Sequence, residues 1–84
     1  MVKGYNTDIR YQGLSYHIQT EDWGEENPFL VSRVFQSGAV IKSLKIHYSE
    51  VLPEVYENRM QTLGFIMKVQ HDKILDLLTS GQLV

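Results

Sequence analysis

The spacing of hydrophobic positions along the chain changes near Pro53. Before this residue, apolar and polar side chains alternate as along β-strands, and after it the apolar side chains recur at helical spacing. The pattern predicts one α+β domain over residues 1–84. A four-stranded antiparallel sheet made of two consecutive hairpins, about residues 5–48, should precede one long C-terminal helix, about residues 53–80, packed on one face of the sheet.

The first hairpin shows the clearest alternation. Its apolar positions should line one face of the sheet, with polar residues on the other face and a turn at Gln12-Gly13. These apolar positions are Tyr5, Thr7, Ile9, Tyr11, Leu14, Tyr16, Ile18 and Thr20. The acidic segment 22–28 then breaks the pattern with a Gly and a Pro, so it is predicted to be an exposed loop whose Trp23 folds back onto the sheet.

A second hairpin is predicted from Phe29 to Gln36 and from Ala39 to Tyr48, with a turn at Ser37-Gly38. The first of these strands is apolar on both faces, which is typical of an inner strand. On the return strand, Val40, Leu44, Ile46 and Tyr48 are expected on one face, with Lys42 among them.

The C-terminal helix has recognisable ends and two apolar sides. Ser49 is a candidate N-cap for a short first turn, Pro53 suits the first position of the main helix, and Gly81 suits its end. One stripe should pack on the sheet, namely Tyr56, Met60, Leu63, Met67, His71, Ile74, Leu77 and Leu78. Phe65 and Val69 point to nearly the opposite side, which suggests burial against a second copy of the chain. The alternative is an intramolecular contact with the Trp23 loop or the chain termini.

Composition narrows the chemistry. With no cysteine among 84 residues, neither disulfides nor thiolate zinc sites can support so small a core, and oligomerisation is a natural source of extra stability. The net charge is −2, and it is spread evenly: the first half of the chain has as many acidic residues, and as many basic residues, as the second half. No nucleic-acid partner is therefore expected. No run resembles a signal peptide or a membrane span, which predicts a cytoplasmic protein without membrane contact.

A resemblance adds to this reading. The run Tyr16-His17-Ile18-Gln19-Thr20-Glu21-Asp22, then Phe35 before Gly38, and later Gln70-His71 before Gly81 resemble a small uncharacterised bacterial domain family with a Y-H-[IV]-Q-T-E-D motif. Ser37-Gly38 stands where that family has a glycine pair. The resemblance supports the fold and implies no activity, cofactor or ligand.

Candidate chemical groups are few, and no cofactor or metal is expected. His17 and Glu21 lie too far apart along one strand for an easy metal site, His47 and His71 belong to other elements, and the acidic loop lacks the EF-hand spacing. There is no Cys and no nucleophile motif. A general acid–base pair of His17 with Glu21 or Asp22 is the remaining enzymatic alternative, and the chain is expected not to be an enzyme.

The polar row of the first hairpin, Arg10, His17, Gln19 and Glu21, together with Trp23, is either a solvated face or a surface for a ligand or partner. We therefore expect a non-enzymatic protein-interaction or adaptor module, homodimeric through Phe65 and Val69, that engages an unknown protein partner. The alternative is a regulatory domain in which this face and the Trp23 loop close over a small molecule.

Overall fold

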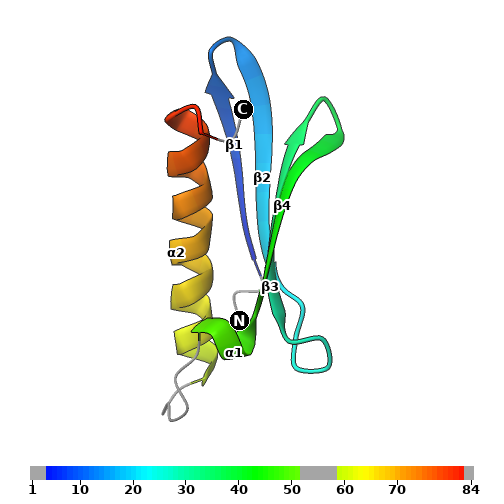
Figure 1. Cartoon of the computed structure of the whole chain (residues 1–84), viewed down its shortest axis with the longest axis vertical. Helices are drawn as coiled ribbons and strands as arrows, with labels where there is room; N and C mark the ends of the chain where they lie inside the picture. The colour runs from blue at the N-terminus through cyan, green and yellow to red at the C-terminus, as the bar shows by residue number, and fades with distance from the viewer. Residues whose placement is uncertain (1–3, 52–58, 83–84) are drawn as a thin grey trace.

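A computed structural model describes residues 4–51 and 59–82. The four strands form one antiparallel sheet in the order β1-β2-β3-β4. Their bounds are β1 Gly4–Tyr11, β2 Leu14–Asp22, β3 Phe29–Gln36 and β4 Ala39–His47, followed by α1 Tyr48–Val51 and α2 Arg59–Thr79. Helix α2 runs along one face of the sheet, and neither of the described helices lies on the other face (Figure 1). The predicted α+β architecture is confirmed.

Both hairpins close through turns of the same kind. Gln12 and Gly13 have φ angles of 52° and 80°, and Ser37 and Gly38 repeat these values. Two successive residues with positive φ make a type I′ turn, whose twist matches that of the flanking strands. The two-residue loops fix the pairing of Tyr11 with Leu14 and of Gln36 with Ala39, which sets the register of each hairpin.

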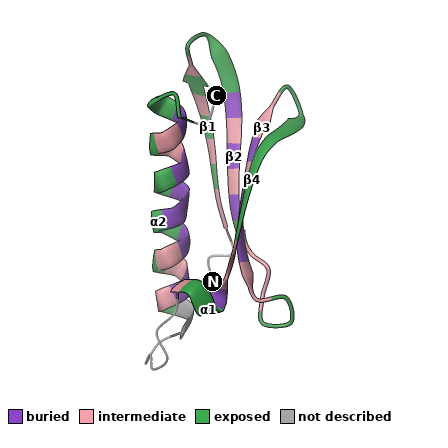
Figure 2. Cartoon of the chain, in the orientation of Figure 1, coloured by how far each residue is buried: buried purple, intermediate pink, exposed green. Residues whose placement is uncertain are grey.

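The core lies between α2 and the sheet (Figure 2). One cluster joins β2 and β3 to the C-terminal half of α2, and a second joins β3 and α1 to its N-terminal half. The first contains Tyr16, Ile18, Val34, Ile74 and Leu78, and the second contains Leu30, Tyr48 and Leu63. The predicted stripe is confirmed at Leu63, Met67, His71, Ile74 and Leu78, whereas Leu77 is half-buried. Tyr56 and the side chain of Met60 lie outside the described part of the structure.

A buried polar chain separates the two clusters. Thr20 Oγ1 lies 2.7 Å from Ser32 Oγ and 2.8 Å from His71 Nδ1, while Thr7 Oγ1 lies 2.8 Å from His71 Nε2. Gln70 Nε2 donates to Ser32 Oγ over 2.8 Å. Three strands and α2 are thus linked by side-chain hydrogen bonds in the middle of the interface. Such bonds fix the position of the helix along the sheet, because sliding of the helix would leave buried polar groups without hydrogen-bond partners.

The start of α1 differs from the prediction. Helix α1 begins at Tyr48, so the residue before it, His47, is the N-cap instead of Ser49. The amide of Ser49 donates to His47 Nδ1 over 3.1 Å, and the amide of His47 donates to Glu50 Oε2 over 2.8 Å. This reciprocal pair is a capping box in which an imidazole replaces the usual hydroxyl. Sequence reasoning chose Ser49 because hydroxyl caps are far more common.

The C-terminal end of α2 follows the prediction. Gly81 has φ of 82°, its amide donates to Leu78 O over 3.1 Å, and the amide of Gln82 donates to Leu77 O over 2.9 Å. These two bonds form a Schellman motif, which requires the left-handed residue that glycine supplies. The predicted start at Pro53 lies outside the described residues, and the described part of α2 begins at Arg59.

A β-bulge overturns one face assignment on β4. The register between β3 and β4 shifts at Val34/Phe35, so Val34 pairs with Lys42 while Phe35 pairs with Val40. Ile41 is the additional residue. Because directly paired residues share a face, Val40 lies with Phe35 on the open face and not with Leu44, as the uninterrupted alternation had predicted. Leu14 also departs from the expected core, since its side chain is 49% exposed at the hairpin tip.

Candidate functional site

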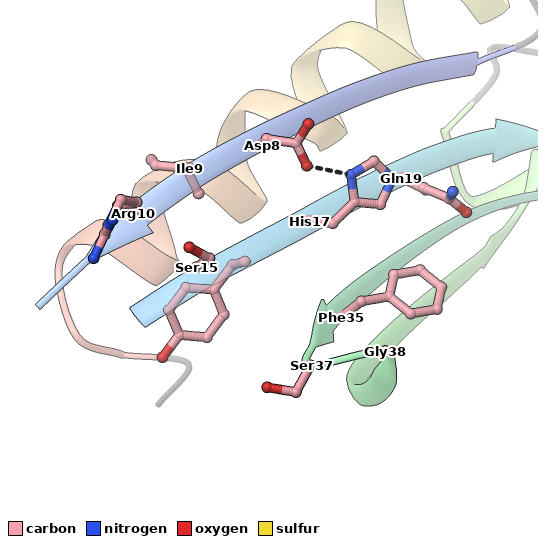
Figure 3. Close-up of a pocket in the computed structure, with 10 residues that line it drawn as sticks. Asp8, Ile9, Arg10, Ser15, His17, Gln19, Phe35, Ser37 and Gly38 are labelled. Atoms are coloured by element: carbon pink, nitrogen blue, oxygen red, sulfur yellow. Dashed lines mark hydrogen bonds and ion pairs between the residues drawn. The ribbon is translucent and has the colours of Figure 1, made fainter. Parts of the chain in front are cut away.

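The sheet face away from α2 carries the candidate site. Strand pairing sets Asp8, His17, Phe35 and Val40 in one row across the four strands. Near this row an open cleft of about 540 Å³ lies at the ends of the two hairpins (Figure 3). The first hairpin contributes Asp8, Ile9, Arg10, Ser15, Tyr16, His17 and Gln19 to its lining, and the second contributes Phe35, Ser37 and Gly38.

An imidazole–carboxylate pair is the central polar feature of this cleft. His17 Nδ1 lies 2.7 Å from Asp8 Oδ1 (Figure 3). The pair arises because the Gln12-Gly13 turn sets residue 8 directly opposite residue 17. Asp8 orients the ring, and Nε2 remains as the polar atom that a bound molecule could meet, as an acceptor when the ring is neutral and as a donor when it is protonated.

The other groups in the cleft suit binding better than catalysis. The rings of His17 and Phe35 lie with centroids 6.0 Å apart at 47°, giving the cleft an aromatic side. Arg10 Nη2 donates to Gly13 O over 3.2 Å, and its remaining N–H groups could meet an anion. Among the hydrogen bonds of the described residues, none joins His17 to Ser15 or Ser37, so the geometry shows no activated hydroxyl.

Only part of the predicted recognition row meets in this cleft. Arg10, His17 and Gln19 line it together, whereas Glu21 and Trp23 are not among its lining residues. Asp8 and Phe35 were missed. Asp8 could have been found from the sequence, because a two-residue turn at Gln12-Gly13 already implies that residues 8 and 17 pair. Phe35 could not, because its position beside His17 depends on the pairing of the two hairpins.

Trp23 folds back onto the sheet, as predicted, but not as a lid over the cleft. The guanidinium carbon of Arg33 lies 5.4 Å from the centroid of the Trp23 ring, and Lys45 Nζ lies 5.0 Å from the same centroid. Lys45 Nζ also lies 4.2 Å from the centroid of the Phe29 ring. These distances are those of cation–π contacts. Val31, which pairs with Lys45 on this face, is only 3% exposed, so the open face has a small hydrophobic centre of its own.

The alternating heptapeptide 16–22 divides its side chains between the two faces. Tyr16, Ile18 and Thr20 are buried beneath α2, and Asp22 accepts hydrogen bonds from the Tyr48 hydroxyl and the Gly24 amide. His17, Gln19 and Glu21 therefore lie on the open face. Half of the motif holds the fold together, and only the other half is available for recognition.

Two further surfaces bear on assembly. Phe65 and Val69 on α2 are 70% and 50% exposed, as the helical spacing predicted, and the Trp23 loop does not cover them. Residues 1–3 and 83–84, the termini named in the alternative, lie outside the described residues. On β4, Val40, Ile41 and Leu44 are 50%, 39% and 37% exposed. The chain thus displays apolar side chains on its helix and on one edge strand.

No described helix is long and apolar enough to cross a membrane. Among residues 4–51 and 59–82, no three His, Asp or Glu side chains gather as a metal site would require. No family model, no curated protein and no solved structure matches the chain in the three comparisons made.

Proposed function

We propose that this chain is a non-enzymatic protein-interaction module of the cytoplasm that self-associates through the outer face of α2. The observation that carries the proposal is the exposed pair Phe65 and Val69, at 70% and 50%. Two neighbouring apolar side chains on the solvent side of a helix lose their contact with water most simply against the same patch of a second copy.

Light scattering of the whole chain at about 100 μM tests this proposal, because association depends on concentration. The wild type should have the mass of a dimer, and Phe65→Glu with Val69→Lys should halve it with secondary structure retained. Leu14→Glu is the control, since Leu14 is 49% exposed at the tip of the first hairpin and does not belong to α2, and its replacement should leave the mass unchanged. A wild-type monomer at this concentration would refute the proposal.

The second candidate is a regulatory domain that responds to a small molecule, and the cleft between the hairpins favours it. A ligand with an aromatic or apolar body and one anionic group would match Phe35, His17 and Arg10. A thermal-shift screen of small carboxylates and phosphates tests this reading, with His17→Ala as the variant that should abolish any shift. Trp23 fluorescence is a less direct probe, because Trp23 does not line the cleft.

A further inference from the structure

Strand β4 is the uncovered edge of the sheet. It pairs with β3 on one side only, and its first seven residues are all exposed (Figure 2). The other edge strand, β1, is covered on one face, because α2 packs on β1 and β2 and His71 is hydrogen bonded to Thr7. Along the outer side of β4, within the described residues, the backbone groups have no strand partner, which is the template that an added strand uses.

The hairpin that contains this edge is basic, although the whole chain carries −2. Residues 28–49 include three cationic side chains, Arg33, Lys42 and Lys45, and no Asp or Glu. The two halves of the chain have equal net charge despite this basic segment, because the acidic residues of the second half all follow position 49. Among the described residues, none of the three cations takes part in an ion pair, and Arg33 and Lys45 lie over aromatic rings instead.

The strand register distributes these charges over both faces of the edge. Lys42 pairs with Val34 and lies on the helix side of β4, while Lys45 pairs with Val31 and lies on the open side. Leu44 is the next residue after Lys42 on the helix side, and on the open side Val40 lies two pairs from Lys45, with Ser43 between them. A strand laid along β4 would therefore meet one lysine and at least one apolar side chain on each of its faces.

We propose that the β4 edge binds an extended, acidic segment of a partner protein as a fifth strand of the sheet. This inference deepens the proposed interaction function by naming the partner's chemistry and the site that receives it. Backbone hydrogen bonds supply the pairing, and carboxylates placed toward Lys42 and Lys45 supply selectivity.

Lysines and bulges on an edge strand also protect against aggregation, and both are present on β4. That role is compatible with selective binding. A neutral strand would remove water from the lysines without supplying an opposite charge, and a basic strand would repel them. A strand that brings carboxylates makes attractive contacts with the same lysines. The edge is thus closed to a second, equally basic β4 and open to an acidic strand.

The test uses the full chain and a synthetic, fluorescently labelled peptide of the length of β4, in which Glu residues three positions apart lie opposite Lys42 and Lys45, one on each face, and the other residues are Val. Three other probes have the same length: the same peptide with alternate backbone amides methylated, a peptide with Lys in place of Glu, and an oligothymidylate. Binding is measured by fluorescence anisotropy. Trp23 emission is an internal reporter, because Lys45 Nζ lies 5.0 Å from its ring and a carboxylate that engages Lys45 changes the environment of the indole.

We expect the acidic peptide to bind and the methylated and basic peptides to fail. Lys42→Glu with Lys45→Glu should weaken binding at least about tenfold, and Lys73→Glu, a matched charge reversal on α2, should change it less than about twofold. Equal binding of the methylated peptide or of the oligothymidylate would overturn the proposal, because either result means that charge alone is recognised. Absence of acidic-peptide binding, or a change of protein mass in the Lys42→Glu/Lys45→Glu variant, would also overturn it. Light scattering of the same samples reports self-association separately, so a monomeric wild type that still binds the peptide would refute only the α2 dimer.

Discussion

Replacement of Thr20 by Val is the sharpest test of the buried polar chain. Thr20 has no exposed surface, and its hydroxyl contacts both Ser32 and His71. Valine has nearly the same shape, so the substitution removes the hydroxyl without opening a cavity. After it, Ser32 keeps its bond from Gln70 and His71 keeps its bond to Thr7, but each loses one partner inside the core.

The magnitude follows from these losses. Each buried polar group that loses a hydrogen-bond partner lowers the free energy of unfolding by roughly 1–3 kcal/mol. The methyl group that replaces the hydroxyl returns about 1 kcal/mol through apolar burial. With two such groups, Ser32 and His71, the net expected loss in the free energy of unfolding is about 1–5 kcal/mol, a large share of the roughly 5–10 kcal/mol available to so small a domain.

Urea denaturation followed by circular dichroism measures this change, with the slope of the transition used to check that unfolding remains two-state. Thr79→Val is the matched control, because Thr79 is exposed at the end of α2 and its hydroxyl bonds only to carbonyl groups of its own helix. The control should lie within about 0.5 kcal/mol of the wild type. A Thr20→Val loss that is equally small, at an unchanged slope, would show that the polar chain does not stabilise the fold.

Three further outcomes are expected. Leu63→Ala should cost about 2–5 kcal/mol in the same assay, because Leu63 is 6% exposed, and an unchanged midpoint would mean that α2 presents another face to the sheet. Burial lowers the pKa of His71 below its ordinary value of 6.5, so the folded state holds the ring neutral more firmly than the unfolded state does. The resulting stability is present above about pH 6.5 and is lost as the pH falls below it, so the urea midpoint of the wild type should drop between about pH 7.5 and 5.5 and that of His71→Leu should drop less. Finally, a strong chelator should leave the melting temperature unchanged, since His17, His47 and His71 lie on three different elements, and a fall of several degrees reversed by zinc would contradict this.

The sequence by itself determined the elements of this protein and most of their faces. Alternation with period two and the two-residue turns at Gln12-Gly13 and Ser37-Gly38 were enough to define both hairpins, because strand pleat and turn geometry are local properties. Helical spacing likewise identified the buried side of α2 and the exposure of Phe65 and Val69. Gly81 marked the helix end because few other residues adopt its φ of 82°.

Tertiary structure decided what pairing and packing impose from a distance. The bulge that moves Val40 to the open face depends on how β4 meets β3, and a strand read alone cannot reveal an additional residue. The cleft needs Phe35 of the second hairpin beside His17 of the first. The bond between Thr20 and His71 joins residues that are 51 positions apart. The exposure of β4 also follows from the docking of α2 over β1 and β2, because one helix is too narrow to cover a four-stranded sheet and leaves the far edge strand open.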